Sequence, residues 1–234
     1  MPHSRPFARH GSAHRAARVF ALAAALALVA PFAPTPVQAQ GVSVGVNAGT
    51  TGVGGNVVIG LTSKLGIRAG LGVLPFTYDG DLDEATFSIE PPPLFGTAGL
   101  DVQLIGPLRI MAGVLYRSDD ILFSADFTDG REIGDEFYEE SGSLSGALTS
   151  ASVAPFVGIG FGRVIGSGIG FYTDFGVAFT GDPGVEVSAS GPITDVPGFY
   201  QDLEQERQTI EDDIGDIYRY WPMLTIGLNI GFGG

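Results

Sequence analysis

Hydrophobic residues and small or polar residues alternate along the C-terminal segment 221–232. The apolar side chains take every second position: Leu224, Ile226, Leu228, Ile230 and Phe232. Because successive side chains of a β-strand point to opposite faces, this segment is predicted to be a strand with one wholly apolar face.

The same alternation occurs seven times upstream, at 42–49, 57–61, 65–73, 97–104, 108–117, 153–163 and 169–180. Short turns at 62–64, 105–107 and 165–168 alternate with connections at 50–55, 79–93, 118–150 and 182–219. Short turns on one side and mostly longer loops on the other are typical of outer-membrane barrels. We therefore predict an all-β fold: an eight-stranded antiparallel up-and-down transmembrane β-barrel. Its tight turns are expected in the periplasm and its irregular longer connections outside the cell.

The positions of the acidic residues favour a barrel in lipid. Of the 26 acidic residues, 24 lie in the connections 79–93, 118–150 and 182–219, and the other two are Asp101 and Asp174 on the small-residue face. The apolar faces carry no charge, and a charge at the middle of a bilayer costs ~2–4 kcal/mol. A soluble lipocalin-like barrel, the alternative, would carry many polar residues on its outer face.

The first 39 residues have the pattern of a secretory signal peptide. Basic residues precede an apolar run at 19–33, and Val37 and Ala39 supply short side chains for cleavage before Gln40. The run has 15 residues, fewer than the ~20 that a membrane-spanning helix needs. We predict a signal peptide at 1–39, a barrel domain at 40–234, and location in the outer membrane. An uncleaved anchor is the alternative.

Without the signal peptide, the chain retains 8 of its 12 basic residues and all 26 acidic residues, a net charge of −18. So acidic a chain is not expected to bind nucleic acid, because such binding depends on Lys and Arg against phosphate. The three histidines lie in the signal peptide and there is no cysteine, so catalytic pairs with His or Cys cannot form. We expect no enzymatic activity, no catalytic residue and no cofactor.

Five charged residues on the small-residue faces are predicted to form an ion-pair cluster in the lumen: Arg68, Asp101, Arg109, Arg117 and Asp174. Charges removed from water need partners, and an eight-stranded barrel is just wide enough for side chains to fill. A packed polar plug is the preferred interpretation. A narrow pore is the alternative, because the many inward glycines leave room for water.

The connection 79–93 contains a weak calcium motif. Asp79, Asp81, Asp83 and Glu90 stand at positions 1, 3, 5 and 12 of an EF-hand-like loop, but Glu84 replaces the glycine at position 6. The alternative is loose binding of Ca²⁺ or Mg²⁺ by the acidic loops, which would bridge them to lipopolysaccharide.

The last connection contains a predicted helix at 197–217. Phe199, Leu203, Ile210, Ile214 and Ile217 recur at helical spacing, with acidic residues elsewhere around the helix. It is expected to fold over the barrel mouth, or alternatively to act as a partner-binding element or lid. Seven aromatic residues near strand ends fit either the membrane boundaries or ordinary packing: Phe76, Tyr78, Phe95, Tyr116, Phe179, Tyr220 and Trp221.

Four stretches, 46–52, 154–162, 174–183 and 211–222, resemble small eight-stranded outer-membrane barrel proteins of the OmpA, OmpX and OmpW type. More closely, the chain resembles a bacterial outer-membrane barrel family in that class with no agreed activity. The last strand also resembles the signal read by the barrel-assembly machinery, at Thr225, Gly227, Ile230 and Phe232, although two glycines follow the aromatic residue.

The sequence therefore predicts an outer-membrane barrel of structural or surface-interaction type, with a plugged polar lumen and acidic external loops. The alternative is a narrow passive channel for small solutes or cations. The expected partners of the protein are outer-membrane lipid, lipopolysaccharide and the assembly machinery, and the protein is expected to be a monomer.

Overall fold

The computed structural model describes residues 41–82, 85–128 and 130–233. The predicted signal peptide lies outside these residues, as do Asp83 and Glu84 of the predicted calcium motif.

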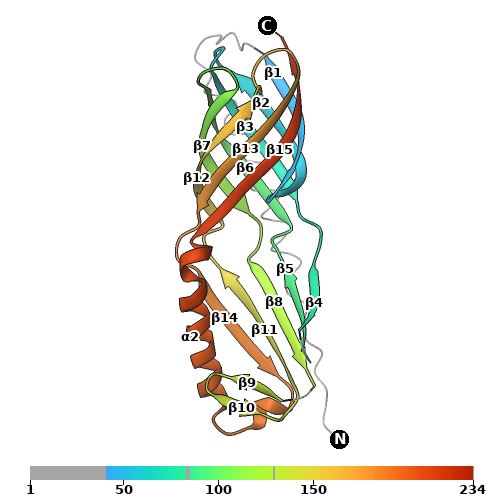
Figure 1. Ribbon diagram of the computed structural model, residues 1–234, viewed down its shortest axis with the longest axis vertical. Coiled ribbons are helices and arrows are strands. Elements are labelled where there is room, and N and C mark those ends of the chain that lie inside the picture. The colour runs from blue at the N-terminus through green and yellow to red at the C-terminus, as the bar shows by residue number, and fades with distance from the viewer. Residues whose placement is uncertain (1–40, 83–84, 129, 234) are drawn as a thin grey trace, which may run out of the picture. The chain divides into compact units, whose positions relative to one another are not determined.

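Eight antiparallel strands close into a barrel in the order β1-β15-β13-β12-β7-β6-β3-β2 (Figure 1). They are β1 (Val42–Gly49), β2 (Gly52–Gly60), β3 (Leu65–Val73), β6 (Leu94–Gln103), β7 (Leu108–Arg117), β12 (Val153–Gly162), β13 (Gly168–Phe179) and β15 (Tyr220–Phe232). The first and last strands close the barrel, with Val42 opposite Phe232 and Gly49 opposite Thr225. The predicted fold class is confirmed.

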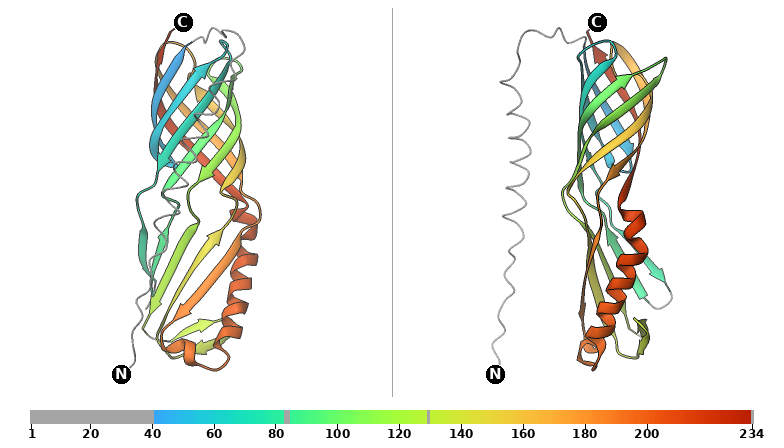
Figure 2. Two further views of the ribbon diagram at one scale, coloured as in Figure 1. Left: turned by 180° about the vertical axis from the view of Figure 1, so that it is seen from behind. Right: turned by 90° about the vertical axis from the view of Figure 1, so that its left-hand side faces the viewer.

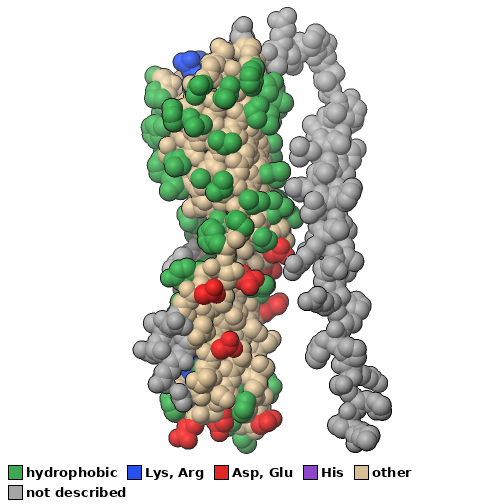
Figure 3. Space-filling view, turned by 90° about the vertical axis from the view of Figure 1, so that its right-hand side faces the viewer, with side chains coloured by type: hydrophobic (Ala, Val, Ile, Leu, Met, Phe, Trp, Pro, Cys, Tyr) green, Lys and Arg blue, Asp and Glu red, His purple; other side chains and the backbone are tan. Residues whose placement is uncertain are grey.

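The apolar faces of the strands point out of the barrel. Leu224, Ile226 and Ile230 of β15 are 44%, 60% and 50% exposed, whereas Asn229 on the opposite face is buried. Figure 3 shows hydrophobic side chains spread over the barrel surface, while the visible acidic side chains lie away from it. This is the distribution that contact with hydrocarbon requires.

The first hairpin is tighter than its sequence suggests. The turn comprises Thr50 and Thr51 alone, and β2 begins at Gly52, whose φ of 91° favours glycine. Gly54 lies within β2, where a Cβ would stand 1.9 Å from the Leu71 carbonyl oxygen of β3. All three glycines predicted to form a turn at 50–55 are therefore strand residues that let neighbouring backbones approach.

The prediction that the long connections are irregular is wrong. They form a second antiparallel sheet of β4 (Tyr78–Leu82), β5 (Ala85–Glu90), β8 (Ile121–Phe127), β11 (Gly142–Thr149) and β14 (Gly184–Ser190), in the order β14-β11-β8-β5-β4. A separate hairpin pairs β9 (Arg131–Ile133) with β10 (Glu136–Tyr138). These strands are short and contain Ser, Gly and Asp, which have low strand propensity. Pairing with neighbouring strands, rather than local propensity, therefore stabilises them.

The predicted helix is confirmed as α2 (Phe199–Tyr218), which follows a 3₁₀ turn, η1 (Pro192–Asp195). It packs along the second sheet rather than over the barrel mouth (Figure 2). A core between the helix, the β9–β10 hairpin and the apolar face of the sheet holds it there: Phe127, Ile133, Tyr138, Ile193, Phe199 and Leu203. No helix in the described part of the chain is long and apolar enough to cross a membrane.

Candidate functional site

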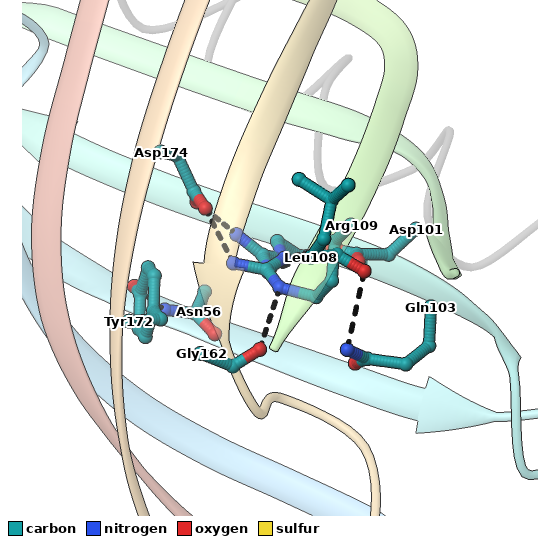
Figure 4. A network of polar contacts seen from close by, with 9 residues as sticks. Asn56, Asp101, Gln103, Leu108, Arg109, Gly162, Tyr172 and Asp174 are labelled. Atoms are coloured by element: carbon teal, nitrogen blue, oxygen red, sulfur yellow. Dashed lines mark hydrogen bonds and ion pairs between the residues drawn. The ribbon is translucent and has the colours of Figure 1, made fainter. Parts of the chain in front are cut away.

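Two arginines and two aspartates from four barrel strands form a closed ring of ion pairs in the lumen. Figure 4 labels three of the four, Asp101, Arg109 and Asp174. Arg68 Nη2 and Arg109 Nη1 each lie 2.6 Å from Asp101 Oδ2. Across the ring, Asp174 Oδ2 lies 2.6 Å from Arg68 Nη1, and Asp174 Oδ1 lies 2.5 Å from Arg109 Nη2. We call these four residues the ionic ring. Sequence analysis predicted all four as members of one lumen cluster.

The ionic ring is removed from water, which makes its pairing necessary. Arg109 is fully buried and Asp101 is 1% exposed. A buried charge that loses its partner is strongly destabilising, because its lost hydration is no longer offset. Arg109 also donates a hydrogen bond from Nε to the Gly162 carbonyl oxygen at 3.1 Å, which fixes the plane of its guanidinium.

Tyr172 of β13 contacts the ring from the side of the tight turns. The Arg68 guanidinium carbon lies 5.0 Å from the centroid of the Tyr172 ring, within the range of a cation–π contact. Asn56 of β2 donates a hydrogen bond to the Tyr172 hydroxyl at 2.6 Å. Neither residue was predicted from the sequence, although both lie on the same strand faces as predicted inward residues.

Inward glycines make the space that the ring occupies. A Cβ at Gly160 would stand 2.6 Å from both Arg109 Nη2 and Asp174 Oδ1. A Cβ at Gly227, one of the predicted assembly-signal residues, would stand 2.4 Å from the Tyr172 ring. The small-residue faces therefore provide room for large charged and aromatic side chains.

Arg117 does not belong to this ring, which corrects the predicted cluster. Although it points inward, it ends β7 near the second sheet, whereas Arg109 begins that strand. Its guanidinium lies 3.3 Å from Asp120, donates to the Ala151 carbonyl oxygen and also bonds the Ser150 hydroxyl. Partners at the barrel rim thus satisfy this charge locally.

Apolar clusters lie in the lumen on both sides of the ring. On the side of the tight turns, Val164 and Ile165 from the turn after β12 pack with Val58 and Tyr172, and we call this set the floor cluster. On the side of the second sheet lies the roof cluster: Phe95, Leu115, Ala154, Phe156 and Ala178, with Trp221 and Met223 packed against it. Phe95 and Trp221 therefore face the lumen, with ring centroids 5.4 Å apart, rather than the membrane boundary.

A cavity of about 70 Å³, here called the chamber, lies between the ionic ring and the roof cluster. Arg68, Asp101 and Asp174 line one part of it, and Phe95 and Phe156 line another. The lumen is thus layered, with an apolar floor, a charged ring, a small chamber and an apolar roof.

The second sheet has one apolar face under α2 and one polar face. Four serines lie opposite one another on neighbouring strands of the polar face: Ser88, Ser124, Ser145 and Ser188. They line a shallow hollow of about 400 Å³ together with Glu90 and Glu186. We call this the serine row.

The predicted calcium motif lies at one edge of the second sheet. Asp79 pairs with Ser88 and Asp81 with Thr86 in the β4–β5 hairpin, and Glu90 ends β5. Asp83 lies outside the described residues. Over the ranges that the structure describes, no three acidic, His or Cys side chains gather in a group able to hold a metal ion. Calcium binding at this hairpin stays a prediction.

The other assembly-signal residues all lie in β15. Thr225 lines the chamber, whereas Ile230 and Phe232 are exposed on the outer face of the barrel. Recognition by the assembly machinery stays a prediction.

Polar contacts fasten α2 to the β9–β10 hairpin. Asp202 accepts a hydrogen bond from the Tyr138 hydroxyl, and Glu206 accepts one from the Gly134 backbone N–H at 3.2 Å. Burial, reinforced by the bond to Asp202, raises the pKa of Tyr138 to about 12. Farther along the exposed face of the helix, hydrogen bonds from Arg207 and then Gln208 lower the pKa of Glu204 to about 2.

The structure resembles two solved structures from Acinetobacter baumannii, CarO2 and CarO. The TM-scores are 0.61 and 0.59, with 19% and 18% sequence identity, over 83% and 85% of this chain and all of each of those chains. A major outer membrane protein from Thermus thermophilus has a TM-score of 0.36, too low to support an argument. No protein-family model and no curated protein matches the sequence. The chain therefore shares the fold of outer-membrane β-barrel proteins of the CarO kind, and this likeness establishes the fold alone.

Proposed function

We propose that this chain is an outer-membrane protein of structural or surface-interaction type, in which a closed barrel anchors the second sheet outside the cell. The observation that carries the proposal is the layered lumen. A fully buried arginine, Arg109, is held by two aspartates between an apolar floor and an apolar roof. In a barrel built in this way, the interior side chains contribute to stability and occupy the space that a path for solutes would need.

The second sheet is the part of the molecule suited to recognition. It is formed by every connection that leaves one end of the barrel except the β1–β2 turn. Its polar face presents the serine row beside Glu90 and Glu186. Hydroxyl and carboxylate groups on an exposed face suit hydrated, polar partners such as the sugar headgroups of lipopolysaccharide, with Ca²⁺ or Mg²⁺ bridging to phosphates.

The remaining features of this proposal follow from the sequence. The chain is exported with cleavage before Gln40, inserted by the barrel-assembly machinery through its last strand, and acts as a monomer without enzymatic activity or a cofactor. The mass of the protein purified from membranes tests the cleavage site directly.

A narrow passive channel is the rival function, and the chamber is the observation in its favour. For a solute to pass, the floor cluster, the ionic ring and the roof cluster would all have to move. The closed lumen therefore favours the anchoring function.

Single-channel recording with the purified protein in planar bilayers separates the two functions. We expect no unitary openings from the unmodified protein. A variant with one obstruction removed from each layer, Phe95→Ala in the roof cluster, Arg109→Ala in the ionic ring and Ile165→Ala in the floor cluster, serves as the control that the assay detects an opened lumen. Regular openings of the unmodified protein would support the channel and contradict the closed barrel.

A further inference from the structure

The chamber between the ionic ring and the roof cluster combines polar and apolar walls. Asn56, Arg68 and Asp101 contribute polar atoms on one side. The apolar side chains of Phe95, Met111, Phe156 and Met223 line another part. A molecule that fills this space meets hydrogen-bonding groups at one end and hydrocarbon at the other.

Three buried polar atoms beside the chamber have neither a hydrogen-bond partner nor an ion pair within the described residues. They are Asp101 Oδ1, Asn56 Oδ1 and Arg68 Nε. Asp101 and Asn56 are 1% and 5% exposed, so bulk water does not reach them freely. An unsatisfied buried polar group costs free energy, and such groups in native proteins are normally paired with protein, water or a ligand.

The two oxygens accept hydrogen bonds and the arginine nitrogen donates one, so a matching group must both donate and accept. A primary amide, with two N–H donors and a carbonyl acceptor, can bond all three atoms. A hydroxyl can donate to one of the two oxygens and accept from the arginine, whereas an ammonium group cannot accept and a carboxylate cannot donate. The ionic ring also balances two positive against two negative charges and therefore offers no net charge to a charged ligand. Burial of an unpaired charge beside it would be costly.

We propose that the chamber binds a small uncharged amphipathic molecule, of the class of short-chain alcohols and amides. Its polar head accepts a hydrogen bond from Arg68 and donates to Asp101, to Asn56 or, in an amide, to both, and its apolar body lies against Phe95 and Phe156. This inference goes beyond the anchoring function, and its failure would leave that function unchanged.

The size of the chamber limits the ligand. A cavity needs roughly 10–15 Å³ to admit one water molecule, so a volume of about 70 Å³ admits at most about five to seven. The ligand is therefore limited to a molecule of about five non-hydrogen atoms, such as 1-butanol. Thr51, Gly72 and Thr225 also line the chamber, next to the β1–β2 turn, where β1 ends opposite Thr225 while β15 continues to Tyr220. β15 thus extends past the end of β1, and the proposed route of entry lies at this end of β1.

The single tryptophan of the chain reports on occupancy. Trp221 packs against Phe95, which lines the chamber. We would titrate the full mature protein in phosphatidylcholine vesicles with 1-butanol and record Trp221 emission. The expected result is a saturable change, distinct from the linear effect of alcohol in the lipid. Butyrate, a charged molecule of similar size, should give no saturable change.

Two variants and a matched control locate the site. Thr97→Leu fills the chamber and should abolish the saturable change, whereas Ala98→Leu places the same side chain on the exposed outer face and should preserve it. Asn56→Leu removes one acceptor and should weaken binding at least fivefold. Circular dichroism tests whether each variant is folded. If Thr97→Leu does not fold, the weaker binding expected of Asn56→Leu tests the location of the site.

Two outcomes would overturn the proposal. A linear response to 1-butanol that is identical in all variants would show that the chamber holds water only. Saturable binding of butyrate as tight as that of 1-butanol would show that the chamber does not select uncharged molecules.

Discussion

Arg109 shows what a single charged residue requires inside a barrel. Its guanidinium contacts both aspartates of the ionic ring and the Gly162 carbonyl oxygen, so each side of the group has a partner. The side chain is fully buried, and water cannot replace a partner that is removed. The contribution of Arg109 to stability is therefore best measured by comparison with an exposed arginine.

Replacing Arg109 with methionine is expected to destabilise the barrel by about 3–5 kcal/mol, the usual result of breaking a buried ion pair. Arg219→Met is the matched control. Its ion pair with Asp182 is 2.6 Å long but exposed, so a loss of at most ~1 kcal/mol is expected. Urea unfolding in lipid vesicles measures both. Equal losses in the two variants would contradict a structural role for the ionic ring.

Glycines in this chain differ in how much space surrounds them. A Cβ at Gly160 would collide with Arg109 and Asp174, whereas a Cβ at Gly215 of α2 meets nothing within 4 Å. Gly160→Ala should lower the free energy of unfolding by about 1–3 kcal/mol, as overpacking typically does. Gly215→Ala should raise it by about 0.5–1 kcal/mol, since alanine is the better helix residue. The two substitutions are expected to change the free energy of unfolding in opposite directions in the same assay.

At the scale of elements, α2 and the β9–β10 hairpin stabilise each other. Phe199 packs edge-on against Tyr138 at 5.5 Å between ring centroids, and the Tyr138 hydroxyl bonds Asp202. The helix is also acidic, with Arg207 between Glu204 and Glu211 one turn away on each side. The hydrophobic contacts set its position, and the polar contacts fix the hairpin on it.

This contact predicts a pH dependence. Tyr138 ionises near pH 10 in the unfolded chain and at about 12 in the folded protein, mainly because it is buried. Folding therefore favours the neutral phenol. The stability this provides is complete below pH 10 and is lost as pH rises from 10 through 12.

Spectrophotometric titration of the tyrosines checks this value. The difference between the unmodified protein and Tyr138→Phe should titrate with a midpoint near 12. Unfolding free energy should fall between pH 10 and 12 less steeply in Tyr138→Phe. A difference titration centred at 10 would contradict the buried, hydrogen-bonded phenol.

At the scale of the whole molecule, charge and topology indicate one orientation. Lys64 and Arg163 lie at the tight turns of the barrel, whereas the second sheet and α2 carry the exposed acids. If the second sheet lies outside the cell, the tight turns at the other end of the barrel lie in the periplasm. Because the chain contains no cysteine, introduced cysteines report on each side separately.

Gln208→Cys on the exposed face of α2 should react with a membrane-impermeant maleimide in intact cells. Lys64→Cys, exposed in a tight turn, should react only after the outer membrane is disrupted, and Ile226→Cys should be protected by lipid. Labelling of Lys64→Cys but not Gln208→Cys in intact cells would reverse the orientation. Strong labelling of Ile226→Cys would place that face in water.

The strict alternation of apolar with small or polar residues made it possible to predict the barrel from the sequence. Residues such as Leu224 and Ile226 must all face one solvent, so their period of two fixes strand and face together. The same rule brought Arg68, Asp101, Arg109 and Asp174 to one lumen, because few charges lay on the inward faces. Strand parity would also have placed Phe95 and Trp221 inside, but proximity to strand ends suggested the membrane boundary instead.

Only the tertiary structure decided the height of each residue along the barrel and the formation of the second sheet. The height of each residue along the barrel depends on the register between strands, and this separates Arg117 from the ionic ring at the other end of β7. The second sheet formed because β8 pairs with β5 and β11 with β14, in each case past intervening barrel strands, which local propensity does not encode. The sequence thus determined which face each side chain takes, and long-range strand pairing decided which side chains meet.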